Sequence, residues 1–179
     1  GYTSARILTK GLFEQKYGRF EARMKLPFGK GMWPAFWLLG SNIDEVSWPF
    51  CGEIDVMENG GSNPVKVSSA VHGPGYSGGN PIKKEYTFDN SRADEFHIYG
   101  IEWGPRYINF YVDDVLYNQL TPESLDAKNV DRSNWVFDNG PFYIIINLAV
   151  GGNFDGNPNA DTVFPQTMYV DYVRVFSED

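Results

Sequence analysis

The chain has 179 residues, of which 42% are hydrophobic and 16% aromatic, and its formal net charge is −8. This length suits one domain with a hydrophobic core, and no apolar run approaches the roughly 20 residues that a membrane-spanning helix needs. The acidic balance argues against nucleic acid, because phosphate binding requires a basic surface. We therefore expect neither nucleic acid nor a membrane among the partners.

The cysteine content and the N-terminal residues bear on disulfides and targeting. The single cysteine, Cys51, excludes an internal disulfide, and the acids beside it would raise the pKa of its thiol, so we expect a packing role. Residues 1–6 show no basic segment followed by an apolar one, so no signal peptide is expected in this sequence.

Short apolar or alternating segments separated by turn residues predict an all-β sandwich. In residues 18–26 one face carries Phe20, Ala22, Met24 and Leu26 and the other face is polar, as in a half-buried strand. The turn Asp113-Asp114 predicts a hairpin. Strands are expected at residues 18–26, 33–39, 65–72, 96–103, 107–112, 115–117, 142–150 and 168–176. The one helical candidate is short, at residues 122–126.

An acidic segment interrupts this pattern. Glu53 and Asp55 point to the same face of a regular strand, because side chains alternate. Glu58 lies five residues after Glu53, so strict alternation sends it to the opposite face. A one-residue β-bulge at Val56 or Met57 would return it to the shared face.

Acids so arranged favour catalysis. Neighbouring carboxylates raise one another's pKa, and hydrolysis of a glycosidic bond needs one ionised nucleophile and one protonated acid. A third acid between them can orient the nucleophile and tune both. An exposed acidic strand or a cation site are the alternatives, but calcium loops use Asn, Gly and carbonyl ligands, whereas Ile54, Val56 and Met57 are strand residues. The high aromatic content suits both a β-rich core and a sugar-binding cleft.

The acidic hexapeptide resembles the signature of glycoside hydrolase family 16, and within it that of the bacterial endo-β-1,3-glucanases, or laminarinases. The likeness spans nearly the whole chain, at residues 2–7, 17–23, 33–37, 53–58, 71–78, 147–152 and 170–175. It implies an all-β fold, a concanavalin-like β-jelly-roll sandwich of two antiparallel sheets with a concave sugar-binding cleft. It also implies that residues 1–179 form a single glycoside hydrolase catalytic domain.

The resemblance assigns roles to the acids. It implies Glu53 as the nucleophile, Glu58 as the acid/base and Asp55 as the helper between them. Lichenases of the family, which act on mixed β-1,3-1,4-glucan, usually lack the residue that corresponds to Met57. The longer spacing favours the laminarinase branch, although agarases and carrageenases share it.

The resemblance also suggests sugar-binding residues. Trp103 matches a tryptophan beside the sugar being cleaved, with a core ring as the alternative. Trp33 and Trp37 lie four apart on one face of a strand in a segment that lines the cleft. Arg6 matches a position that binds a sugar on the non-reducing side, and His72 one near the acids. The alternative for Arg6 is a surface arginine, and the alternative for His72 is a structural histidine.

Some expectations concern the surroundings of the site. The family often carries a structural calcium, for which Asp171 is the candidate ligand, with a plain exposed aspartate as the alternative; no cofactor is expected for catalysis. Family members usually carry about 50 further residues before the stretch at residues 2–6. Their absence would leave a sheet edge open, so self-association or a separate N-terminal segment is expected. The resemblance implies a secreted, extracellular protein.

These observations lead to one leading hypothesis, a retaining endo-hydrolase of β-1,3-glucan. The first alternative is another specificity in the family, for mixed-linkage glucan, agar or carrageenan. The acidic net charge disfavours a sulfated substrate, which needs clustered Arg or Lys. The second alternative is a carbohydrate-binding module or lectin on the same fold, which explains the aromatic residues but not the spacing of the acids.

Overall fold

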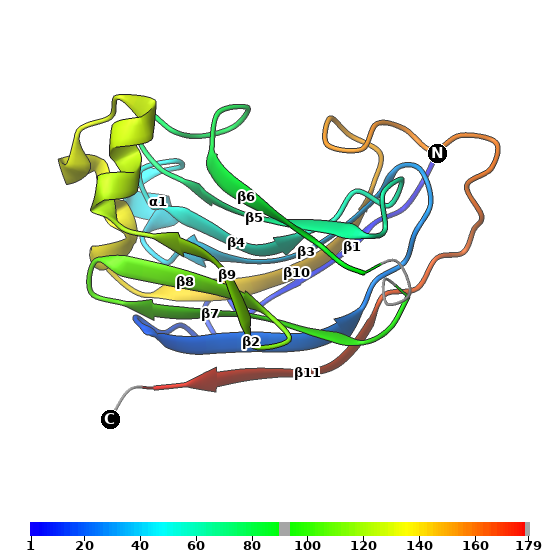
Figure 1. Cartoon of the computed structure of the whole chain (residues 1–179), viewed down its shortest axis with the longest axis horizontal. Coiled ribbons are helices and arrows are strands. Elements are labelled where there is room, and N and C mark those ends of the chain that lie inside the picture. Colours follow the sequence, from blue (N-terminus) through cyan, green and yellow to red (C-terminus); the bar gives the residue numbers. More distant parts are fainter. Residues whose placement is uncertain (90–93, 178–179) are drawn as a thin grey trace.

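The computed structural model describes residues 1–89 and 94–177, which form two antiparallel sheets stacked face to face (Figure 1). One sheet has the strand order β1-β10-β3-β4-β5-β6, and the other has the order β11-β2-β7-β8-β9. The strands are β1 (Ala5–Leu8), β2 (Gly18–Lys25), β3 (Met32–Gly40), β4 (Glu53–Glu58), β5 (Lys66–His72), β6 (Ile82–Thr87), β7 (His97–Gly104), β8 (Tyr107–Val112), β9 (Val115–Leu120), β10 (Phe142–Val150) and β11 (Tyr169–Phe176). The all-β prediction is confirmed.

The main core lies between the two sheets, and period-two alternation creates it. Phe20, Ala22 and Met24 of β2 are fully buried, as their spacing predicts, and they join a cluster that takes residues from both sheets. On β10 the residues from Phe142 to Ile146 are buried, whereas those from Asn147 onward are only partly buried. The first half of this strand is therefore covered on both faces, whereas its second half is partly open to solvent.

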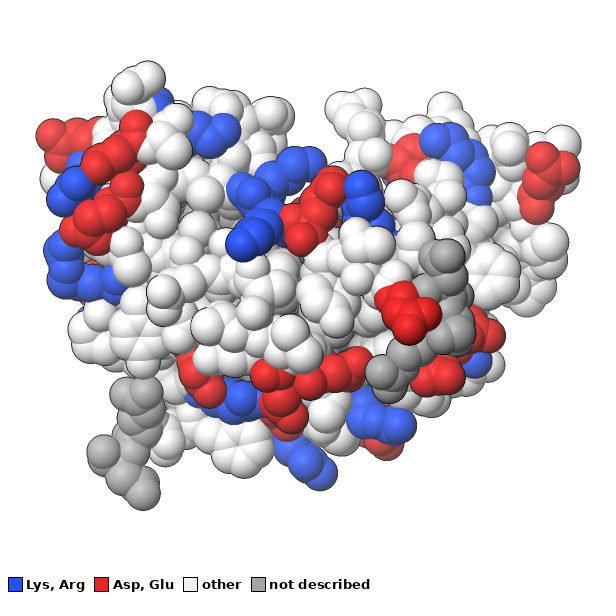
Figure 2. All heavy atoms as spheres, in the orientation of Figure 1, with Lys and Arg blue, Asp and Glu red and all other residues white. Residues whose placement is uncertain are grey.

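The outer face of the six-stranded sheet carries two cavities, one of them lined by residues of the loops at 73–81 and 151–156. In Figure 1 the first of these loops stands above the sheet on one side, and the loop after β10, drawn in orange, stands on the other. In the space-filling view the same edge of the molecule shows a notch between two raised walls, with charged side chains of both signs beside it (Figure 2). The sandwich thus presents one open, concave surface.

Several short elements were not predicted from the sequence. The structure adds the edge strand β1, the polar strand β6, the helix α1 (Ile43–Val46) and two 3₁₀ helices at Arg132–Asn134 and Val136–Asp138. The expected helix is a 3₁₀ helix over Pro122–Lys128. Both residues of the Asp113-Asp114 turn have positive φ, 49° and 63°, as the two-residue turn of a hairpin requires.

Two further points concern the chain as a whole. Cys51 is buried beside Leu39, Tyr143 and Ile145, and burial raises the pKa of its thiol, so the expected packing role is confirmed. Within the described residues, no helix is long and apolar enough to cross a membrane.

Candidate active site

A β-bulge on β4 places the three acids together. In the pairing with β5, Asp55 lies opposite Ala70 and Glu58 opposite Ser68, so the two residues Val56 and Met57 face the single residue Ser69. The pairing with β3 shifts at the same point. Val56 and Met57 are adjacent in sequence, yet both are buried in the core. The bulge returns Glu58 to the face of Glu53 and Asp55, as predicted.

The acids contact a histidine on the neighbouring strand. His72 of β5 lies opposite Glu53 in the register. Its Nε2 atom is 3.0 Å from Oδ2 of Asp55 and 3.9 Å from Oε1 of Glu53. The backbone N–H of Gly78 donates to Nδ1 at 3.1 Å. Since Nδ1 accepts a hydrogen bond, the neutral ring carries its proton on Nε2, on the side of the acids. Within the described residues, Oδ2 of Asp55 nevertheless receives no hydrogen bond.

This tautomer also bears on the cation alternative. Glu53, Asp55 and His72 form a group whose potential ligand atoms lie within 4.8 Å of one another. A metal-binding nitrogen must offer a lone pair, but Nε2 of the neutral ring holds a proton. In this tautomer the ring of His72 therefore offers no lone pair to a cation beside the acids.

The surroundings keep protons on the cluster. Burial, and after it the charge of Asp55, raises the pKa of Glu53 to about 8. Burial and then the charge of Glu58 raise the pKa of Asp55, and burial raises that of Glu58. Such interacting groups titrate as a unit. The cluster therefore holds protons to higher pH than separate carboxyl groups would. Glycoside hydrolysis needs such a proton on its acid, whereas its nucleophile must be ionised.

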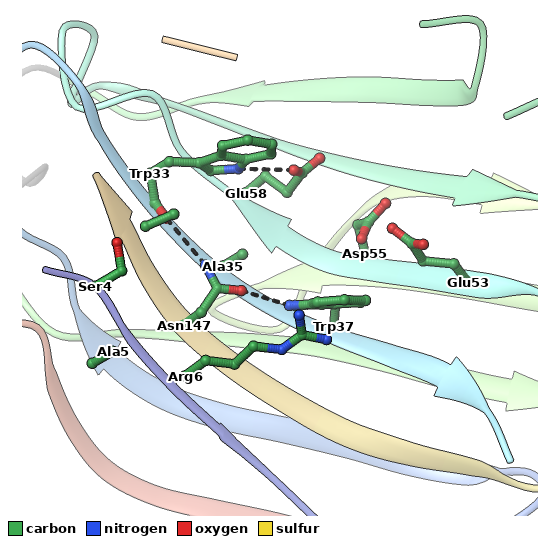
Figure 3. A pocket seen from close by; sticks show the side chains of 11 residues that line it. Ser4, Ala5, Arg6, Trp33, Ala35, Trp37, Glu53, Asp55, Glu58 and Asn147 are labelled. Atoms are coloured by element: carbon green, nitrogen blue, oxygen red, sulfur yellow. Dashed lines mark hydrogen bonds between the residues drawn. The ribbon is translucent and has the colours of Figure 1, made fainter. Parts of the chain in front are cut away.

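On one side of the acids lies a cavity of about 300 Å³, here called the Trp37 pocket (Figure 3). The indole N–H of Trp37 donates to Asn147 at 2.8 Å, and the guanidinium of Arg6 lies 4.8 Å from the Trp37 ring centre. Asn147 in turn donates to the carbonyl of Trp33 at 3.3 Å. Ala35, which pairs with Glu58, leaves open space beside that acid.

On the other side lies a hollow of about 550 Å³, here called the Lys83 hollow. It shares Trp33, Glu53 and Glu58 with the Trp37 pocket, so the acids stand where the two cavities meet. Its further lining residues come from β5, β6 and the neighbouring loops, and they are Trp48, Ala70, His72, Gly78, Gly79, Pro81, Lys83, Asn153 and Phe154.

Two tryptophans hydrogen-bond the acids directly. The indole N–H of Trp33 donates to Oε1 of Glu58 at 3.0 Å, and that of Trp48 donates to Oε2 of Glu53 at 2.7 Å. Both bonds favour the ionised carboxylate and lower its pKa. Trp33 was predicted at the cleft, whereas Trp48 was not. In the sequence, Trp48 is marked by nothing more than its position five residues before Glu53.

The structure brings together Arg6, Trp33, Trp37 and His72 as predicted, but it does not bring Trp103 to the cleft. Trp103 lies on β7, in the other sheet, and is 0% exposed. Its ring packs edge-on against Tyr17 at 5.2 Å and Phe142 at 5.0 Å. The expected sugar contact of Trp103 is therefore wrong in this structure, because its side chain points into the core between the sheets.

Asp171 lies far from this site in the fold, on the edge strand β11. Its carboxylate is 2.7 Å from the guanidinium of Arg23, and β11 pairs irregularly with β2 at this residue. Among the described residues Asp171 joins no group of three candidate metal ligands. Its assignment as a calcium ligand stays a prediction.

The matches to known proteins agree with this geometry. The model of the glycosyl hydrolases family 16 matches residues 2–174. The chain belongs to this family. Its family 16 relatives include the "Beta-glucanase" of Rhodothermus marinus, which is 43% identical over 98% of the chain; the chain spans 62% of that protein.

Solved structures of the family give the same picture. The laminarinase catalytic domain of Thermotoga maritima has a TM-score of 0.91 and 47% identity, covering 97% of this chain and 69% of its own. The endo-β-1,3-glucanase of Pyrococcus furiosus has a TM-score of 0.90 and 52% identity, covering 96% of this chain and 65% of its own. The expected family 16 jelly roll is confirmed.

Proposed function

We propose that this family 16 chain is a retaining endo-hydrolase of β-1,3-glucan. One observation carries the proposal: the bulged strand β4 presents Glu53, Asp55 and Glu58 on one face, where two cavities meet. The similar proteins include a β-glucanase, a laminarinase and an endo-β-1,3-glucanase, and this supports the substrate class. A polymeric substrate is consistent with a secreted enzyme that acts outside the cell.

The first chemical step joins the sugar to the enzyme. The Glu53 carboxylate attacks the anomeric carbon while Glu58 gives its proton to the departing glycosidic oxygen. The Trp48 indole N–H donates to the nucleophile and holds it in place, and Nε2 of His72 lies 3.9 Å from it. Asp55 lies between the other two acids and repels a second negative charge, which favours a proton in the cluster.

The second step releases the sugar. Glu58, now ionised, takes a proton from water, and the resulting hydroxide attacks the anomeric carbon and displaces Glu53. The Trp33 indole N–H donates to Glu58 at 3.0 Å, and it stabilises the ionised form that this step needs. Two inversions at one carbon retain the configuration.

The test is the hydrolysis of laminarin by the chain and by its Glu53→Gln variant. We expect reducing ends to appear with the unmodified chain, with a β-anomer as the first product in NMR, and no turnover with the variant. Circular dichroism serves as the folding control. Normal turnover by the folded variant overturns the assigned mechanism.

The polysaccharide specificity is tested separately with mixed-linkage glucan, agarose and carrageenan. The highest kcat/KM is expected on β-1,3-glucan. A preference for another polymer would replace the proposed substrate but keep the reaction class. Binding of laminarin without cleavage by the unmodified chain would instead favour the carbohydrate-binding alternative.

A further inference from the structure

The loop at residues 151–156 forms a wall of the Lys83 hollow and also contacts the machinery around Glu58. The ring of Phe154 stacks on that of Trp33 with centres 4.9 Å apart and planes at 10°. Trp33 in turn donates its indole N–H to Glu58. A single aromatic contact therefore connects a surface loop to the acid/base.

Asp155, the next residue, is buried and takes no part in the chemical steps above. Its Oδ2 accepts the backbone N–H groups of Gly31 at 2.7 Å and Ser62 at 3.2 Å. Its Oδ1 accepts the hydroxyl of Ser62, and Lys30 Nζ lies 3.9 Å away. This carboxylate thereby joins three segments: the turn before β3, the turn after β4 and the loop after β10.

Close backbone packing surrounds this carboxylate. Gly60 approaches Asp155 so closely that an added Cβ would lie 3.0 Å from Oδ1, and Gly31, at φ +85°, would place a Cβ 2.4 Å from the nitrogen of Pro158. Charge-assisted hydrogen bonds to fixed backbone donors are strong and directional. The position of Asp155, and with it that of Phe154, is thus set by the two turns.

We propose that Asp155 is a positioning residue for the acid/base, acting through Phe154 and Trp33. By anchoring the loop it keeps Phe154 stacked on Trp33, which fixes the direction of the indole N–H toward Glu58. The same stack lines the Lys83 hollow. This inference rests on the proposed hydrolase function.

The test compares Asp155→Asn and Phe154→Ala with the unmodified chain on β-1,3-gluco-oligosaccharides. Both variants are expected to raise KM by up to about tenfold, the scale of one aromatic pair. Both should also move the alkaline limb of the kcat profile to higher pH, because a less firmly directed N–H stabilises the Glu58 carboxylate less. Asp161→Asn, an exposed acid in the same part of the chain, is the matched control.

The double variant distinguishes positioning from mere stability. If Asp155 acts through Phe154, the two changes together have about the effect of one alone, whereas independent roles give multiplied effects. Multiplied effects, or an unchanged pH profile in Asp155→Asn, overturn the proposal. Failure of the unmodified chain to cleave laminarin is a separate result, which would refute the proposed function instead.

Discussion

The two cavities that meet at the acids are built differently. The Trp37 pocket is made of strand residues tied to one another, with Trp37 bonded to Asn147 and Asn147 bonded to the backbone of β3. The Lys83 hollow is bounded by loops on two sides and contains the titratable groups His72 and Lys83. One cavity is therefore fixed by the sheet, whereas the other depends on loops. We expect the first to control sugar binding and the second to control the departure of the leaving group.

The largest effect is expected from Glu58→Gln, which removes the acid that serves the leaving-group side. General acid catalysis contributes roughly 10²–10⁴-fold, so kcat on laminarin should fall by about that factor. An aryl glycoside with a good leaving group needs little protonation, and its first step should fall far less. Pre-steady-state release of the phenol measures this step. Equal losses on both substrates would contradict the role of Glu58 as the acid.

Removal of the main ring from the fixed cavity is expected to have the next largest effect. Trp37→Ala should raise KM for oligosaccharides by about tenfold or more, because a large ring contact is lost. Initial rates over a range of substrate concentrations give the value. Trp37→Phe keeps a ring but loses the hydrogen bond to Asn147. Its KM should therefore lie between that of the unmodified chain and that of Trp37→Ala. An unchanged KM in Trp37→Ala would show that the Trp37 pocket does not bind the sugar.

A smaller effect, on pH dependence, tests the Lys83 hollow. The positive charge of Lys83 lowers the pKa of Glu58, so Lys83→Met should raise it. Glu58 must be protonated in the first step, and activity should therefore persist to higher pH in this variant. The alkaline limb of the kcat/KM profile reports the shift. Lys84→Met is the matched control, because Lys84 is the next residue on β6 and points to the other face; a shift in both variants would indicate a general charge effect.

The smallest effect on the reaction is expected from Trp103→Phe, because Trp103 lies outside both cavities. Replacement of a buried indole by a smaller ring should lower the free energy of unfolding by about 1–3 kcal/mol. KM for oligosaccharides should be unchanged. Urea denaturation followed by circular dichroism measures the stability. A raised KM without a loss of stability would indicate that Trp103 contacts the sugar after all.

The sequence predicts the acids well because their chemistry and their spacing both indicate a shared catalytic face. Period-two alternation places Glu53 with Asp55, and the five-residue step to Glu58 requires the bulge that the structure contains. Trp33 and Trp37 follow from the same period. Local spacing is sufficient wherever the residues lie on one strand.

The errors arise where the fold decides which way a side chain points. Trp103 alternates on its strand, but the pattern does not say which sheet that strand joins, and β7 turns its ring inward. Trp48 and Phe154 sit in loops whose path back to Glu53 and Trp33 depends on distant partners such as the turns that hold Asp155. Contacts between segments that are far apart in sequence have no periodic signal.

The bulge on β4 has a consequence for how this scaffold can diversify. Since Val56 and Met57 are both anchored in the core, the offset between nucleophile and acid is locked by the interior of the sandwich. The loop residues Gly79, Pro81 and Asn153 border the Lys83 hollow and belong neither to that lock nor to the Asp155 anchor. A library randomised only at these positions should therefore yield catalysts with altered polymer preference and unaltered stereochemistry. In this scaffold, reaction outcome and substrate choice can evolve as separate traits.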